Sequence, residues 1–79
     1  MKAKDIVHEY FKRVFDDTTV IVKLNPLDFT GTEMIIHPDG KIELTELNFD
    51  EDIYEDFKVD EFEKTNPLEF NLYLNKLVK

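Results

Sequence analysis

The chain has 79 residues, a formal net charge of −8 and no cysteine. The lack of cysteine excludes disulfides and thiolate metal sites, and the negative charge disfavours direct binding to nucleic acid or to anionic membranes. A chain this short buries only about 60% of its unfolded surface. We therefore expect residues 1–79 to form a single small globular domain whose core relies on aromatic side chains.

Residues 3–16 carry apolar side chains at the spacing of one helix face. The stripe consists of Ala3, Ile6, Val7, Tyr10, Phe11 and Val14. Recurrence at i, i+3, i+4 and i+7 is typical of an amphipathic helix that packs on a core. The sequence therefore predicts a helix over 3–16. Charged residues within it break any continuous apolar stretch of the kind that a secretory signal requires.

Residues 18–24 are rich in β-branched side chains and precede a proline. The run Thr-Thr-Val-Ile-Val-Lys-Leu favours a strand. Pro26 ends it, because proline has no N–H for the ladder and restricts the residue before it. We predict a strand over 18–24, with Val20, Val22 and Leu24 on one face and Ile21 on the other, followed by a loop over 27–31.

Residues 32–47 predict a β-hairpin around Pro38, Asp39 and Gly40. Proline presets φ for the first turn position, and glycine supplies the positive φ that closes a type I turn with a G1 bulge. The turn fixes a register that pairs His37 with Lys41, Ile36 with Ile42, Ile35 with Glu43 and Met34 with Leu44. Because side chains alternate between faces, Met34, Ile36, Ile42 and Leu44 are expected in the core, with Ile35 on the outer face beside Ile21.

Residues 48–65 hold eight acidic residues and two lysines, which concentrates a charge of −6 in one connection. Aromatic and aliphatic residues run through it, so it does not have the composition of a disordered acidic tail. Asn48 or Asp50 is a candidate cap for a short helix over 51–57. We expect extended chain over 57–62.

The last predicted helix begins at Asn66-Pro67-Leu68-Glu69. Asparagine is a preferred N-cap, proline fits the first helical position, and glutamate at the third completes a capping-box pattern. The expected core stripe is Phe70, Tyr73, Leu74, Leu77 and Val78. Leu68 and Leu72 fall on roughly the opposite side at about 100° per residue, where the acidic segment or another molecule would cover them.

These elements predict an α+β fold of two layers with the order α-β-β-β-(short α or loop)-α. Its sheet is a three-stranded antiparallel meander with two helices packed on one face. The order resembles that of the double-stranded-RNA-binding domain, which implies RNA contacts from a basic start to the final helix. Residues 65–69 read Thr-Asn-Pro-Leu-Glu after an acidic run, so RNA binding is not expected.

The chain offers few groups for catalysis. It has no serine or cysteine nucleophile, and no base can be placed beside a threonine. His37 and Asp39 are two potential metal ligands on a turn, too few for a site, and an EF-hand loop starting at Asp50 would need glycine where Glu55 stands. We therefore predict a protein that is not an enzyme and has no cofactor or metal.

The leading hypothesis is a small, acidic, bacterial-type cytoplasmic protein that acts as a protein–protein interaction or regulatory module. The expected partner is a protein, with a basic one favoured, and a homodimer is the alternative use of the same surface; no membrane contact is expected. The candidate binding residues are Ile21, Ile35, Tyr54, Leu68, Leu72, Asp50, Glu51, Asp52 and Glu55, apolar anchors with an acidic rim. The alternatives are a nucleic-acid mimic that inhibits a DNA- or RNA-binding protein and, third, a carboxylate- or metal-dependent enzyme.

Overall fold

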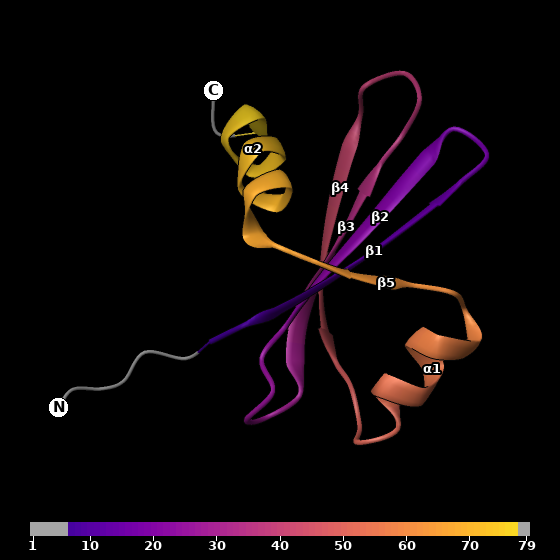
Figure 1. The fold of residues 1–79 in the computed structure, drawn as a ribbon. Coiled ribbons are helices and arrows are strands. Elements are labelled where there is room, and N and C mark those ends of the chain that lie inside the picture. Colours follow the sequence, from indigo (N-terminus) through magenta and orange to yellow (C-terminus); the bar gives the residue numbers. More distant parts are fainter. Residues whose placement is uncertain (1–6, 78–79) are drawn as a thin grey trace, which may run out of the picture.

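The structure, a computed structural model, describes residues 7–77 and has an α+β fold on a five-stranded antiparallel sheet (Figure 1). The elements are β1 (Glu9–Phe15), β2 (Thr18–Leu24), β3 (Thr30–Ile36), β4 (Ile42–Asn48), α1 (Ile53–Val59), β5 (Glu63–Thr65) and α2 (Pro67–Leu77). The strand order is β4-β3-β2-β1-β5. The first four strands form a meander, and β5 returns to pair with the outer side of β1.

The central strand β2 is apolar on both faces. Val20, Val22 and Leu24 lie in one buried cluster together with Ile53 of α1. Ile21, which alternation turns to the other face, lies in a second cluster under α2. The two helices therefore cover opposite faces of the sheet, and Figure 1 shows α1 and α2 on opposite sides and toward opposite ends of it.

Aromatic stacking builds the core on the α1 side. The rings of Phe11 and Phe57 stack with centroids 4.3 Å apart, and Phe62 packs against Phe57 with centroids 5.1 Å apart. Ile53 and Phe57, one helical turn apart, are the buried residues of α1. A helix of only seven residues is marginal alone, so these packed rings, not helix propensity, hold it in place.

Phe70 anchors α2 to the other face. Its side chain is 2% exposed, and its ring lies 5.6 Å from that of Tyr10. Beside it, the Lys12 ammonium on β1 donates to both carboxylate oxygens of Glu69, at 2.8 and 3.0 Å. The helix is therefore held by one buried ring, by the packing of Tyr73 and Leu74 on the same cluster, and by one half-buried ion pair near its first turn.

The predicted fold class is wrong in the number of strands, in the first element and in the placement of the helices. The sheet has five strands and not three. Residues 9–15 form β1 instead of the second half of a helix, and the part of that predicted helix over 3–6 lies outside the described residues. The helices pack on both faces. The order shared with the double-stranded-RNA-binding domain therefore does not hold either.

The apolar residues of the first segment fit the spacing of a helix face, but they also fit a strand that is buried on both of its faces. Tyr10 and Phe11 are adjacent and both buried, on opposite faces of the sheet, which a strand allows when both faces are covered. Asp16, with a φ of 53°, and Asp17 form a two-residue turn that returns the chain, so that Phe15 pairs with Thr18. Aspartate tolerates this left-handed conformation.

The predicted hairpin is confirmed in position and register. Met34 pairs with Leu44, Ile35 with Glu43 and Ile36 with Ile42, and the N–H of His37 donates to the carbonyl of Lys41 at 2.8 Å. Gly40 has a φ of 93°, the positive value that the turn requires. The strand predicted over 18–24 is also confirmed as β2.

The last helix begins as predicted, and the short helix lies two residues later than expected. The Asn66 carboxamide oxygen accepts the N–H of Leu68 at 2.9 Å, which caps α2. In front of α1, Asp50 accepts the N–H of Asp52 at 2.9 Å. The chain expected to be extended over 57–62 instead continues α1 to Val59.

No helix within residues 7–77 has both the length and the apolar content to cross a membrane.

We expect Ile21→Ala to lower the free energy of unfolding by about 2–5 kcal/mol, because it leaves a cavity at a fully buried position. Ile21 is 0% exposed under α2, whereas Val14 on the same face is 59% exposed. Val14→Ala is the matched control, with a change within about 0.5 kcal/mol. Urea unfolding followed by circular dichroism measures both, and equal effects would contradict the placement of Ile21.

Candidate functional site

The structure does not leave the apolar outer face that the sequence predicts. Ile21 is 0% exposed because α2 lies over it, and Ile35 is half-buried and packed against the core on the α1 side. The two side chains also lie on opposite faces of the sheet. Neither belongs to a joint binding surface, and Ile21 is out of reach of any partner.

Leu68 and Leu72 do form an exposed apolar surface. They are 75% and 57% exposed, one turn apart on the side of α2 that faces away from Phe70. An open hollow of about 620 Å³ lies along them, and its lining is Thr65, Asn66, Leu68, Glu69, Leu72 and Tyr73. We call this the α2 hollow. Its residues come from one continuous segment, so its shape depends on the capped start of α2.

The acidic candidates surround α1. Asp50, Glu51, Asp52 and Glu55 are all exposed. Among the described residues, none of these four carboxylates lies within ion-pair distance of a lysine, arginine or histidine. Their charge is therefore not neutralised locally, and this side of the molecule carries a strong negative potential.

The acidic surface and the α2 hollow lie on different sides of the molecule. Figure 1 shows α1 and α2 separated by the sheet, and the two buried clusters place them on opposite faces. The predicted arrangement of leucine anchors with a rim of acids from residues 50–55 is therefore not brought together. The structure offers two separate surfaces.

Tyr54 ties α1 to the sheet. Its hydroxyl donates to a carboxylate oxygen of Glu9 at 2.7 Å, and the other oxygen of Glu9 lies 4.0 Å from the Lys64 ammonium. Burial, the hydrogen bond and the charge of Glu9 raise the pKa of the Tyr54 hydroxyl above 10.0, because the neutral phenol is the form that can donate. With 37% of its surface exposed, Tyr54 is a structural link that is partly accessible to solvent.

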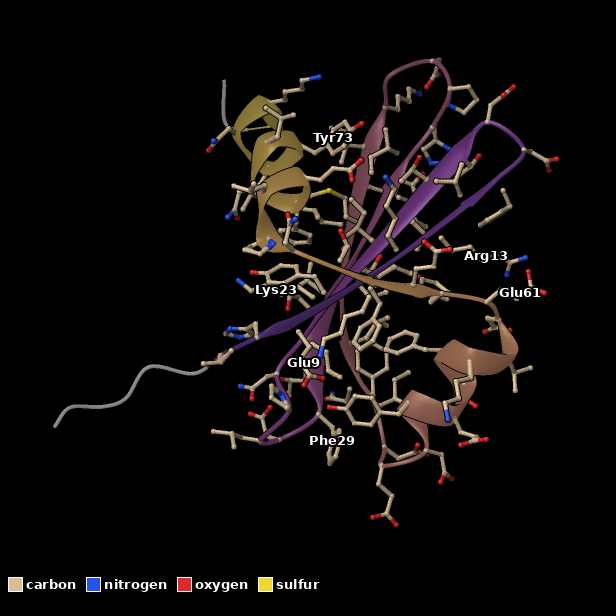
Figure 2. All side chains as sticks on the ribbon, in the orientation of Figure 1. Glu9, Arg13, Lys23, Phe29, Glu61 and Tyr73 are labelled. Atoms are coloured by element: carbon tan, nitrogen blue, oxygen red, sulfur yellow. The ribbon has the colours of Figure 1, made fainter. Side chains whose placement is uncertain are left out.

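A polar hollow on the α2 side was not foreseen from the sequence. It has a volume of about 160 Å³ and is lined by His8, Lys23, Asn25, Thr30, Gly31, Thr32 and Glu46. The Thr32 hydroxyl lies 3.2 Å from each carboxylate oxygen of Glu46, and Figure 2 shows Lys23 on this side of the sheet, below Tyr73. The site offers both donors and acceptors to a molecule of a few heavy atoms.

The alternation of residues 8–12 was the signal that could have found this hollow. Read as a strand, His8 shares a face with Tyr10 and Lys12, and the pairing of Glu9 with Leu24 brings it beside Asn25. Read as a helix, His8 lies far from Lys23. The polar hollow therefore depends on the first element being a strand.

The histidine of the hairpin turn makes a local contact. His37 Nε2 lies 3.0 Å from a carboxylate oxygen of Glu43 across the hairpin, and the turn aspartate Asp39 accepts the N–H of Lys41. Within the described part of the chain, no three histidine, cysteine, aspartate or glutamate residues are grouped to hold a metal ion. That the protein is not an enzyme stays a prediction.

The chain has no match among protein-family models, curated proteins or solved structures. A functional assignment therefore depends on the surfaces described above.

The raised pKa of Tyr54 predicts how stability changes at high pH. The phenol favours the folded state below its unfolded pKa of 10.0, and that contribution is lost as the pH rises through the higher folded pKa. Tyr54→Phe removes the contribution, so above pH 10.0 its free energy of unfolding should fall less steeply than that of the wild type. Burial also raises the pKa of Tyr10, so Tyr10→Phe provides a second comparison. Parallel pH profiles for wild type and Tyr54→Phe would contradict the Tyr54–Glu9 bond.

Proposed function

We propose that the protein is a small, non-catalytic protein–protein interaction or regulatory module that acts in the cytoplasm through the outer side of α2. The observation that carries this proposal is the exposure of Leu68 and Leu72, at 75% and 57%, beside an open apolar hollow. Burying apolar surface is worth about 25 cal/mol per Å². Two neighbouring leucines on a firmly docked helix therefore supply apolar anchors for a partner with a groove.

The α2 surface suits a partner with a complementary apolar groove. Leu68 and Leu72 are spaced i, i+4, the pattern by which a helix presents anchors to such a groove. Asn66, Glu69 and Asn75 lie around them and provide polar groups for the rim. Because Phe70 and the Lys12–Glu69 ion pair already fix the helix, little ordering cost is added on binding.

The acidic surface around α1 supports a role in attracting a basic partner. It lies across the sheet from the α2 hollow, beyond direct contact with a ligand in that hollow. Charges on one side of a small protein still raise the association rate with a basic partner, an effect that salt screens within about 8–10 Å. We assign the acids a steering role and the leucines the contact.

A nucleic-acid mimic that inhibits a DNA- or RNA-binding protein is the second candidate function. The observation that favours it is the unneutralised acidic surface, where Asp50, Glu51, Asp52 and Glu55 are exposed without an ion-pair partner among the described residues. Such an inhibitor would use α1 and its flanks in place of α2.

Replacement of Leu72 by aspartate separates these functions. Leu72→Asp should abolish capture of a partner from a lysate of the native organism at high salt, because it places a charge in the apolar contact. Val59→Asp is the matched control, since Val59 is 74% exposed on α1, and it should retain capture.

Capture that Leu72→Asp leaves intact would contradict the α2 interface. If all variants capture a DNA- or RNA-binding protein and all release it at high salt, the result would instead support the mimic. Salt screens the charge interaction, which would be the only attraction between a mimic and its target. Light scattering of the purified protein distinguishes a second copy from a different partner. A dimer that Leu72→Asp dissociates would identify the hollow as a homodimer contact.

A further inference from the structure

The outer strand β4 is an open edge of the sheet. It has seven residues and pairs with β3 alone, and residues 43–46 are all exposed. The other edge is β5, which has three residues and runs directly between α1 and α2. β4 is therefore the long unpaired edge of the sheet, and an additional strand would pair with it there.

β4 has charged residues, Glu43 and Glu46, but none of the other usual devices that block strand addition. Native edges are commonly protected by proline, lysine, a bulge or a covering element. The sequence of β4 is Ile-Glu-Leu-Thr-Glu-Leu-Asn, with neither proline nor lysine. Its seven consecutive pairs with β3 keep one register from Thr30–Asn48 to Ile36–Ile42, so no bulge twists the edge away.

The alternation of bonded and non-bonded pairs between β3 and β4 shows which backbone groups of β4 face outward. The N–H of His37 donates to Lys41, and the N–H of Phe49 donates to Phe29. Antiparallel pairs alternate between bonded and non-bonded ones, so the residues of β4 that bond to β3 are Glu43, Thr45 and Leu47. The N–H and C=O groups of Ile42, Leu44 and Glu46 therefore point to the open edge.

Charge selects what can pair with this edge. β3 and β4 together carry Glu33, Glu43 and Glu46 and neither lysine nor arginine. The Glu43 side chain is 62% exposed even though it contacts His37. A second copy would bring two such strands and two net charges of −8 together, which is unfavourable, whereas an extended basic segment would place lysines opposite the glutamates.

We propose that β4 binds an extended, lysine- or arginine-containing segment of another protein, which adds to the sheet as a sixth strand antiparallel to β4. Main-chain bonds to Ile42, Leu44 and Glu46 hold the segment, and its basic side chains pair with Glu43 and Glu46. This surface is separate from the α2 hollow, so binding at β4 can be tested independently of the function proposed above.

The probe that tests this is a blocked peptide, Thr-Lys-Thr-Val-Lys-Val-Thr. In antiparallel register its lysines lie opposite Glu46 and Glu43, and its first valine lies opposite Leu44. Titration at millimolar peptide, followed by amide chemical shifts and hydrogen exchange, should shift and protect the N–H groups of Leu44 and Glu46. A peptide with both lysines replaced by glutamate should give no protection.

Two variants test the backbone and the charge separately. Leu44→Pro removes an outward N–H without breaking a bond to β3, which an edge strand tolerates, and should abolish binding, whereas Leu44→Ala should retain it. Glu43→Gln and Glu46→Gln, at exposed positions that leave the fold intact, should each weaken binding by up to about fivefold. Spectral dispersion checks that Leu44→Pro is folded.

The proposal is overturned if the basic peptide shifts only residues of α1, or if the acidic peptide binds equally. It is also overturned if Leu44→Pro, once shown to be folded, binds like the wild type, or if both glutamine variants do. Protection of Leu44 and Glu46 in the free protein, with a dimer in sedimentation, would show that a second copy is the occupant instead.

Discussion

β2 carries apolar side chains on both of its faces, and the other elements are placed so that these apolar side chains are shielded from water. Leu24 and Ile21 are 0% exposed although they point in opposite directions. A 79-residue chain cannot build two large layers, so it covers each face with one helix over part of its area. The fold is thin for this reason, with a smallest extent of 19 Å.

This constraint explains which parts of the fold could be predicted from sequence. The turn at Gly40 and the cap at Asn66 are local, because a few neighbouring residues determine the backbone there. The first strand is not local. Tyr10, Phe11 and Val14 fit a helix face as well as a strand, and what decides between them is pairing with β2 and with Thr65. Such distant partners leave no mark on the segment itself.

The same distinction applies to the candidate surfaces. Leu68 and Leu72 could be identified as spare because they lie opposite the core stripe of one capped helix. The burial of Ile21 could not be predicted, because it depends on where α2 packs; helices packed on one face only would have left Ile21 exposed. The separation of the acids from the leucines has the same origin: both are on the surface, but the sheet lies between them.

The return of β5 to β1 has a consequence for the order in which the chain can fold. Tyr10 pairs with Thr65, so the open side of β1 stays unpaired until most of the chain has been synthesised. Over that interval the meander exposes the aromatic residues of β1, and unpaired strands in such intermediates are prone to aggregate. Residues 48–65, which cover the α1 face and close this edge, also carry the net charge of −6. Mutual repulsion between nascent chains therefore rises just as the open side of β1 is being closed.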